Sequence, residues 1–304
     1  MKIKAYAKIN LLLQVLEKRP DGYHNLASVM QEIGLFDLLT ISKAPKGIAL
    51  TCSEQNLTVG TDNLVYKAVL SMQAEADRLK KPVSGLKIHI QKNIPIRAGL
   101  GGGSSDAAAT LKALNKLWLL RLPDKKLIQI GAKIGSDVPF FIKGGTALAK
   151  GRGELLTPWT GIPSFRLVLI KPLLSISTAW AYKNLKISLT KSPKNIKIIQ
   201  YSLKTKRFNQ LKQYLQNDLE AVCITKYPLI LKIKHRLLAA GATITLMSGS
   251  GSTVFGLIAS QTAENSIKEV FSKTKGFWIW SGKTLINTRH KEKNKAQRYK
   301  GTKF

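Results

Sequence analysis

The sequence predicts a protein of two domains that mix helices and strands, in the α/β or α+β class. Chains of 304 residues usually divide into two domains, because a single hydrophobic core stops growing at about this size. Strand-like alternation and helix-like periodicity follow one another in both halves of the chain, as in mixed folds. The segment 158–163 begins and ends with proline and is the expected boundary between the two domains.

The N-terminal half begins with a strand. Residues 2–16 alternate and then run apolar, and Arg19-Pro20-Asp21-Gly22 has the composition of a turn. The further elements expected in this half are a helix at about 62–80 with Asp62 or Asn63 as its N-cap, a strand at 86–91, a helix that Ser104 or Ser105 caps and that ends at Trp118, a helix at 124–134, and a strand, turn and strand over 140–148.

In the C-terminal half the same signals alternate until a basic tail. The expected elements are a strand at 166–170, a basic helical region at about 178–215, a helix at 226–240, strands at 242–247 and 253–258, a helix at 262–273 and a strand at 277–280. The tail 289–304 contains seven Lys or Arg residues against one Glu and has no apolar face, so we expect it to be disordered.

The net charge of +32 is the unusual bulk property of the chain. Polyanionic substrates, a nucleic-acid or membrane partner, or a lysine-rich lineage could each produce it. Aromatic residues are few in the basic regions, which disfavours base stacking and favours a solvated, lysine-rich surface. Two cysteines are too few for a disulfide framework and indicate reduced thiols in a cytoplasmic protein. The uncharged stretch 241–260 is interrupted by Gly, Ser and Thr, so no membrane segment is expected.

The strongest local signal is the run Gly99-Leu100-Gly101-Gly102-Gly103-Ser104-Ser105, between a strand and a helix. Closely spaced glycines let backbone N–H groups approach an anion, because no Cβ is in the way and positive φ angles are open to them. The start of the following helix adds free N–H groups and the positive end of its dipole. The run therefore predicts a phosphate-binding loop. It lacks the lysine of a P-loop, and Ser104 stands where a dinucleotide fingerprint has its third glycine.

Three further signals are weaker on their own. Asp137 in Gly135-Ser136-Asp137 either accepts a proton from a substrate or caps a turn, and the turn is the commoner role. Lys8 and Asn10 lie two positions apart in the first strand and share one face, which meets either solvent or a phosphate. The second glycine loop, 248–252, either closes over a substrate phosphate or forms only a hairpin turn.

In order and spacing, these segments resemble the galactokinase, homoserine kinase, mevalonate kinase and phosphomevalonate kinase (GHMP) superfamily, and within it the family that phosphorylates 4-diphosphocytidyl-2-C-methyl-D-erythritol. The matching segments are Ala7-Lys8-Ile9-Asn10, Arg19 to His24, Pro95 to Ala109, Gly135 to Phe141, Gly151 to Glu154 and Ser248 to Phe255. The two glycine loops are common to the superfamily, whereas Asp21-Gly22-Tyr23-His24 is specific to the cytidyl family. The resemblance covers roughly residues 1–285 and leaves out the basic tail.

The resemblance implies an α+β, GHMP-kinase-like fold with domains at 1–157 and 164–285, and with ATP and substrate in the cleft between them. It implies that ATP phosphorylates the 2-hydroxyl of the cytidyl substrate, a step of the non-mevalonate (methylerythritol phosphate) isoprenoid pathway. ATP is then the phosphoryl donor, Mg²⁺ is expected to accompany it, and no protein ligand of the metal is assigned. The expected partners are these small molecules, with no obligate nucleic-acid or membrane partner.

Carried over residue by residue, the resemblance also assigns roles. Asp137 would be the catalytic base, Lys8 the lysine beside it, and Asn10 the side chain that positions the methylerythritol end. In the cytidine pocket, two tyrosines would stack on the faces of cytosine and a histidine would hold its edge. The assigned binding residues are Tyr23, His24 and Tyr182 for cytidine, Gly249, Ser250 and Gly251 for the rest of the substrate, and Pro95, Gly99, Leu100, Gly101, Gly102, Gly103, Ser104 and Ser105 for ATP.

Two other functions stay open at this point. A related kinase acting on homoserine or mevalonate would have no use for Tyr23, His24 and Tyr182, which only a nucleotide-bearing substrate needs. A basic nucleic-acid or membrane binder on the same fold would lose affinity steeply with salt in a binding titration. Arg97, where the family mostly has a small residue, either touches a phosphate or faces solvent.

Overall fold

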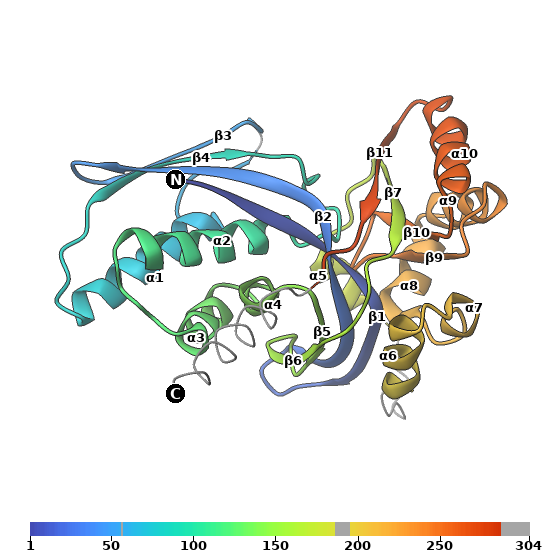
Figure 1. Ribbon diagram of the computed structural model, residues 1–304, viewed down its shortest axis with the longest axis horizontal. Coiled ribbons are helices and arrows are strands. Elements are labelled where there is room, and N and C mark those ends of the chain that lie inside the picture. The colour runs from blue at the N-terminus through green and yellow to red at the C-terminus, as the bar shows by residue number, and fades with distance from the viewer. Residues whose placement is uncertain (56, 186–194, 287–304) are drawn as a thin grey trace, which may run out of the picture.

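Two β-sheets with helices packed against them form the protein, and two long strands connect them (Figure 1). In this computed structural model the structure describes residues 1–55, 57–185 and 195–286, so the tail 289–304 lies outside the described residues. Within these ranges the first sheet has seven strands and the second has four. The predicted mixture of helices and sheet is confirmed.

The first sheet is built around β1 (Lys2–Lys18) and β2 (His24–Ala44), an antiparallel pair. The predicted turn joins them, with the Gly22 N–H donating to the Arg19 carbonyl at 3.1 Å. The other strands are β3 (Ile48–Cys52), β4 (Gly85–Gln91), β5 (Thr146–Lys150), β6 (Leu155–Trp159) and β8 (Gln216–Asn217). The strand order is β3-β4-β2-β1-β8, and β5 pairs with both β2 and β6.

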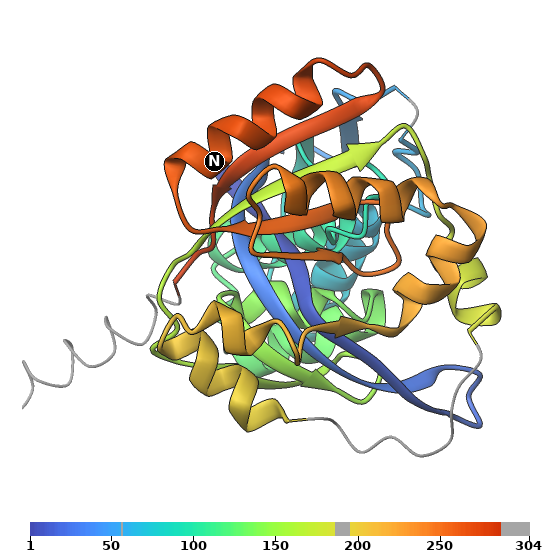
Figure 2. The same cartoon turned by 90° about the vertical axis from the view of Figure 1, so that its right-hand side faces the viewer.

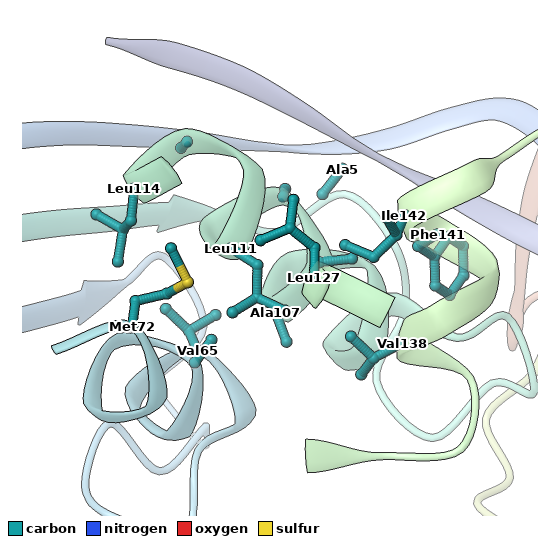
Figure 3. Packing of buried hydrophobic residues seen from close by; sticks show 14 of the residues in the cluster. Ala5, Val65, Met72, Ala107, Leu111, Leu114, Leu127, Val138, Phe141 and Ile142 are labelled. Atoms are coloured by element: carbon teal, nitrogen blue, oxygen red, sulfur yellow. The ribbon is translucent and has the colours of Figure 1, made fainter. Parts of the chain in front are cut away.

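Four helices pack against one face of this sheet (Figure 1): α1 (Leu64–Arg78), α2 (Gly102–Leu117), α3 (Asp124–Ile134) and α4 (Val138–Lys143). Of the two predicted candidates, Asp62 and Asn63, it is Asn63 that caps α1, by accepting a hydrogen bond from a first-turn N–H. Figure 3 shows apolar side chains from all four helices meeting in one core, including Met72, Leu111, Leu127 and Phe141. This core fixes the start of α2 and the start of α4 relative to β1.

The second sheet has the order β11-β7-β10-β9, and every neighbouring pair is antiparallel. Its strands are β7 (Arg166–Pro172), β9 (Ile244–Met247), β10 (Val254–Ile258) and β11 (Phe277–Lys283). Figure 2 shows two helices in front of it, α9 (Leu229–Ala239) and α10 (Gln261–Ser272). The shorter helices of this half are α5 (Thr178–Lys183), α6 (Ile196–Lys204), α7 (Phe208–Leu211) and α8 (Asp218–Lys226).

A hydrophobic cluster joins the two halves of the chain. It combines Ile9 and Leu11 of β1 with Leu167 of β7 and Phe255 of β10, and all four side chains are fully buried. β8 extends this junction, because it pairs in parallel with β1 although it belongs to the C-terminal half of the sequence. The loops that meet at the junction are therefore held by both sheets.

Two local predictions are wrong. The segment 140–148 is not a strand, turn and strand, because its first part belongs to α4; a short, fully buried apolar run does not distinguish a strand from a helix. No serine caps α2, because Gly101 occupies the N-cap with a left-handed φ of 72° and the helix begins one residue later. The basic helical region expected at about 178–215 contains three separate helices, α5, α6 and α7, and its residues 186–194 lie outside the described ranges.

Candidate active site

Lys8 is buried in the middle of β1, with only 4% of its surface exposed. The β1–β2 register shifts between Tyr6 and Lys8, and the Lys8 N–H donates instead to the Leu100 carbonyl at 3.0 Å. The ammonium donates to Asn10 Oδ1 at 2.6 Å and to the Gly99 carbonyl at 3.2 Å. A buried cation requires such acceptors, because an unpaired charge is costly to remove from water. Lys8 therefore does not lie on a solvent face, which was one of its two alternatives.

Asn10 shares the face of Lys8, as the period of a strand predicts, and is also buried. Its Nδ2 donates to Ser28 Oγ at 2.8 Å, and the Ser28 hydroxyl donates to the Leu12 carbonyl at 2.7 Å. These contacts orient the amide, with its nitrogen toward β2 and its oxygen toward Lys8. Ser28 is thus a positioning residue that the sequence analysis missed, because a single serine 18 residues away gives no local signal.

Asp137 precedes α4 and faces Lys8. Its Oδ2 lies 3.6 Å from Lys8 Nζ, and 31% of the aspartate side chain is exposed against 5% of the lysine side chain. Asp137 is the N-cap of α4, yet within the described chain its carboxylate makes no capping hydrogen bond. Pro139 in the first turn stiffens the backbone that carries it. One side of the carboxylate is therefore held near a buried cation while the group keeps access to solvent.

The first glycine loop, 99–103, closes against Lys8 and α4. A Cβ on Gly101 would lie 2.8 Å from the Phe141 ring and 3.2 Å from Lys8 Cε, and the left-handed φ also favours glycine. Gly103 is exposed, and a Cβ there would meet only Leu64 Cδ1, at 3.7 Å. The loop is thus closed on its Lys8 side and open at Gly103, where the N-terminal amide groups of the 16-residue α2 begin.

The remaining residues of the predicted ATP loop surround this opening. Pro95 is half-buried in the loop after β4, and Leu100 is buried beneath the glycines. Ser104 is half-buried and Ser105 is buried, both in the first turn of α2. Arg97 is exposed with a φ of 52°, a left-handed conformation that few residues other than glycine adopt.

The second glycine loop, 248–252, lies directly against the first. The Gly99 carbonyl accepts a hydrogen bond from Ser248 Oγ at 3.0 Å in addition to the one from Lys8. A Cβ on Gly249 would lie 3.0 Å from that carbonyl oxygen, 3.3 Å from Lys8 Nζ and 3.4 Å from Asn10 Oδ1. The loop does connect the antiparallel strands β9 and β10, but it also forms one wall of the space around Lys8.

Two residues outside the predicted set hold the second loop. Asn217 is buried, and its Nδ2 donates to the Met247 carbonyl at 2.8 Å and to the Gly249 carbonyl at 2.7 Å. Thr178, the first residue of α5, shares a hydrogen bond with the Ser250 hydroxyl at 2.8 Å. The one sequence signal for Asn217 is its position before an apolar run, because its Oδ1 also caps α8.

The residues predicted to bind cytidine gather at the β1–β2 turn and on α5. The rings of His24 and Tyr182 stack with centroids 5.5 Å apart and an interplanar angle of 24°. Tyr23 is 54% exposed, and the Arg152 guanidinium lies 4.9 Å above its ring centroid. Burial, with a smaller effect of the Asp137 charge, raises the pKa of Tyr182 to about 12, which couples this group electrostatically to the candidate base. Burial also lowers the pKa of His24, so its ring is neutral at pH 7.

A buried cluster of ion pairs packs against the first glycine loop. The Lys92 ammonium donates to Asp106 Oδ2 at 2.8 Å and also to Asp37, whose other oxygen accepts two backbone N–H groups of the loop after β4. A Cβ on Gly102 would lie 3.2 Å from Lys92 Nζ. Burial, reinforced by the Asp37 charge and opposed by Lys92, raises the pKa of Asp106 to about 7. Sequence analysis missed this cluster, whose members come from β2, the end of β4 and α2.

The chain matches two family models, GHMP kinases N terminal domain over residues 63–145 and GHMP kinases C terminal over residues 199–275. It is 44% identical over 291 residues to 4-diphosphocytidyl-2-C-methyl-D-erythritol kinase of Thermodesulfovibrio yellowstonii, which covers 93% of this chain and 97% of that protein. Its identity to the kinase of the same name from Citrifermentans bemidjiense is 41% over 286 residues, covering 94% and 99%. The chain belongs to the 4-diphosphocytidyl-2-C-methyl-D-erythritol kinase family.

Solved structures agree with membership of the 4-diphosphocytidyl-2-C-methyl-D-erythritol kinase family. A crystal structure of 4-(cytidine 5'-diphospho)-2C-methyl-D-erythritol kinase matches with a TM-score of 0.80 at 31% identity, over 93% of this chain and 99% of that one. Homoserine kinase from Cytophaga hutchinsonii matches with a TM-score of 0.73 at 18% identity, over 94% of this chain and 95% of that one, which shows the fold alone. The predicted GHMP-kinase fold is confirmed, and the chain is an ATP-dependent small-molecule kinase.

Some features are absent from the part of the chain that the structure describes. None of its helices combines the length and the apolar character needed to cross a membrane. No group of three or more His, Cys, Asp or Glu side chains in this part is placed to hold a metal ion. Cys52 is half-buried and Cys223 is buried, and both are free thiols. Burial raises the pKa of Cys223 to about 11, so this thiol is a poor nucleophile.

Proposed function

We propose that this chain transfers the γ-phosphoryl group of ATP to the 2-hydroxyl of 4-diphosphocytidyl-2-C-methyl-D-erythritol. The observation that carries the proposal is the 3.6 Å contact between Lys8 Nζ and Asp137 Oδ2 where the two glycine loops meet. Phosphoryl transfer needs positioning and charge stabilisation more than covalent chemistry from the protein. A base, a buried cation and phosphate-binding backbone groups within one small space meet this need.

Asp137 is the proposed general base, and Lys8 its partner. The solvent-accessible carboxylate can accept a hydrogen bond from the acceptor hydroxyl and take its proton as the new P–O bond forms. The Lys8 ammonium can stabilise negative charge on the transferring oxygens. Asn10 gives one hydrogen bond to Ser28 and receives one from Lys8, so each end of its amide keeps capacity for the methylerythritol hydroxyls.

The first glycine loop is the proposed site of the ATP phosphates. The N–H groups of Gly102, Gly103 and Ser104 begin α2, where the helix dipole is positive. Pro95, together with residues 99–101, completes the loop around them. Mg²⁺ bound to the phosphates would add positive charge there, and it commonly keeps its waters and uses one or two protein oxygens. The Ser105 hydroxyl suits this role better than Glu154, whose Oε2 accepts the Arg152 N–H within its own turn.

The acceptor is proposed to extend from Asp137 to the aromatic group at the β1–β2 turn. The exposed ring of Tyr23 is available to cytosine, and the half-buried ring of Tyr182, held by its stack with His24, would form the second wall. Stacking of a base on an aromatic side chain contributes about 1–3 kcal/mol. Neutral His24 offers one donor and one acceptor to the cytosine edge. Gly249, Ser250 and Gly251 border the space next to Lys8 and would contact the methylerythritol end.

The test is ADP formation by the purified full chain with ATP, Mg²⁺ and one of three acceptors: the diphosphocytidyl alcohol, homoserine or mevalonate. We expect ADP only with the cytidyl acceptor, at a rate that depends on its concentration. A reaction without any acceptor, assayed in parallel, measures contaminating ATPase activity. ADP formation with homoserine or mevalonate, and none with the cytidyl alcohol, would refute the proposed substrate while leaving the kinase assignment intact.

A further inference from the structure

A hollow of about 420 Å³ lies beside the proposed catalytic pair. Its lining includes Tyr23 and Ser136, the neighbour of Asp137. The hollow is therefore bordered both by a proposed cytosine-binding residue and by the residue next to the proposed base. Two cationic residues that none of the proposed roles uses, Lys133 and Arg152, also line it.

Arg152 reaches the hollow from the turn between β5 and β6. Its guanidinium lies over the Tyr23 ring, and its backbone N–H donates to Glu154 Oε2 at 2.7 Å, which fixes the turn. The flanking Gly151 carbonyl accepts the Leu26 N–H of β2 at 2.8 Å, so the turn is tied to the strand that follows Tyr23. The position of Arg152 is thus set by the backbone and by the aromatic ring.

Lys133 reaches the hollow from the last turn of α3. Neither Lys133 nor Arg152 forms an ion pair with a carboxylate of the described residues. Asp21, whose carboxylate Arg152 influences, is paired with Arg19 at 3.1 Å. Two cations that share a hollow and lack a neutralising acid attract an anion of matching size.

We propose that Lys133 and Arg152 form the subsite for the diphosphate of the acceptor; the inference rests on the proposed function. A diphosphate diester carries one negative charge on each phosphate group, which the two cations match. The planar guanidinium can donate two hydrogen bonds to one phosphate, and the ammonium acts as a point charge on the other. The Ser136 hydroxyl adds a donor next to the base. Homoserine and mevalonate have no diphosphate, so this subsite selects against both.

The experiment compares Arg152→Gln and Lys133→Gln with a matched control, Lys125→Gln. Lys125 is an exposed lysine in the first turn of the same helix and lines neither the hollow nor the glycine loops. For each full-length variant we would measure kcat, the KM of the cytidyl acceptor and of ATP, and the inhibition constants of cytidine and of cytidine diphosphate. Thermal unfolding of each variant checks that it is folded.

The two test variants should each raise the KM of the acceptor and the inhibition constant of cytidine diphosphate by about 10-fold or more, as expected for loss of a charge-assisted hydrogen bond. The inhibition constant of cytidine and the KM of ATP should stay within about twofold. Lys125→Gln should leave all of these constants within about twofold. Arg152→Lys keeps the charge without the two-pronged donor and should recover only part of the loss.

Several outcomes overturn the inference. An equal loss for cytidine and cytidine diphosphate would show that Arg152 only supports the Tyr23 ring. A rise in the KM of ATP instead of the acceptor KM would place the cations at the other substrate. Unchanged constants in variants of an active enzyme would refute the subsite alone. A wild-type chain that does not phosphorylate the cytidyl alcohol would refute the proposed function, and the subsite with it.

Discussion

Replacing Asp137 with asparagine keeps the size of the side chain but removes its ability to take a proton. At 3.6 Å, unit charges attract by about 4–5 kcal/mol if the effective dielectric constant is about 20. The 31% exposure of the aspartate side chain lowers the net value. The base itself contributes about 10²–10⁴ in rate, and a late proton transfer places this case near the lower limit. We therefore expect kcat to fall by about 10² in Asp137→Asn.

The variant should remain folded, because Lys8 keeps two other acceptors, Asn10 Oδ1 and the Gly99 carbonyl. The KM of ATP should change by less than about twofold, since the first glycine loop is untouched. Lys8→Ala should also reduce kcat severely. The double variant should cost much less than the product of the two single effects, because the pair acts as one unit.

The test measures kcat of each variant by steady-state kinetics with saturating ATP. Thermal unfolding checks that each variant is folded. If Asp137→Asn retains more than about a third of the wild-type kcat, the catalytic assignment of Asp137 is wrong. Single effects that multiply in the double variant would show instead that Lys8 and Asp137 act independently.

Tyr182→Ala should raise the KM of the cytidyl acceptor about 10-fold and leave the KM of ATP unchanged. If the acceptor KM of the variant equals that of the wild type, Tyr182 does not stack on cytosine. Gly99→Ala should lower the melting temperature by several degrees at least, because its Cβ would lie 2.0 Å from the Ser248 carbonyl oxygen, whereas Gly103→Ala should change the melting temperature little. Equal shifts of the melting temperature in calorimetry would contradict the close approach of the two loops. The pKa of Asp106, raised to about 7 from the ordinary value near 3.9, means that the folded chain binds more protons than the unfolded chain between these values. This contribution to the free energy of unfolding is full below about pH 4 and is lost as the pH rises through about 7. In denaturant titrations, Asp106→Asn should therefore flatten the fall in the free energy of unfolding between about pH 5 and 7. If the free energy of unfolding of the variant falls as steeply with pH as that of the wild type, the result counts against the raised pKa.

Local patterns predicted the parts of the fold whose signal lies within a few residues. The shared face of Lys8 and Asn10 follows from the period of a strand, and Asp62 and Asn63 were the two candidate caps from their place before an apolar run, of which Asn63 is the cap. The two glycine loops were also found, because several glycines in one loop are rare without a structural need. Their mutual contact was not predicted, since Gly99 and Ser248 are 149 residues apart.

Other elements were missed for identifiable reasons. β2 is a 21-residue strand for which no prediction was made. Residues 26–31 are buried on both faces, and over 32–41, where burial does alternate, Phe36 and Leu38 are apolar on the less buried face while Asp37 is polar on the buried one. The helix α4 was taken for a strand because its buried apolar run is short and nearly continuous. The ion cluster of Lys92, Asp37 and Asp106 depends on a lysine 55 residues from one acid and 14 from the other, a spacing that no local rule detects.

The Gly99 carbonyl oxygen has a consequence for how ligands enter and leave. It accepts hydrogen bonds from Lys8 of β1 and from Ser248 of the second loop, and the Thr253 N–H donates to the neighbouring Ala98 carbonyl at 3.4 Å. Both halves of the molecule are thus fastened together at the point where phosphate would pass between substrates. If ATP and the acceptor bind as proposed, we expect them to exchange at different openings, the nucleotide at Gly103 and the acceptor past the exposed Tyr23 turn. We also expect the slow motion of the catalytic cycle to involve those outer turns and not a separation of the two halves.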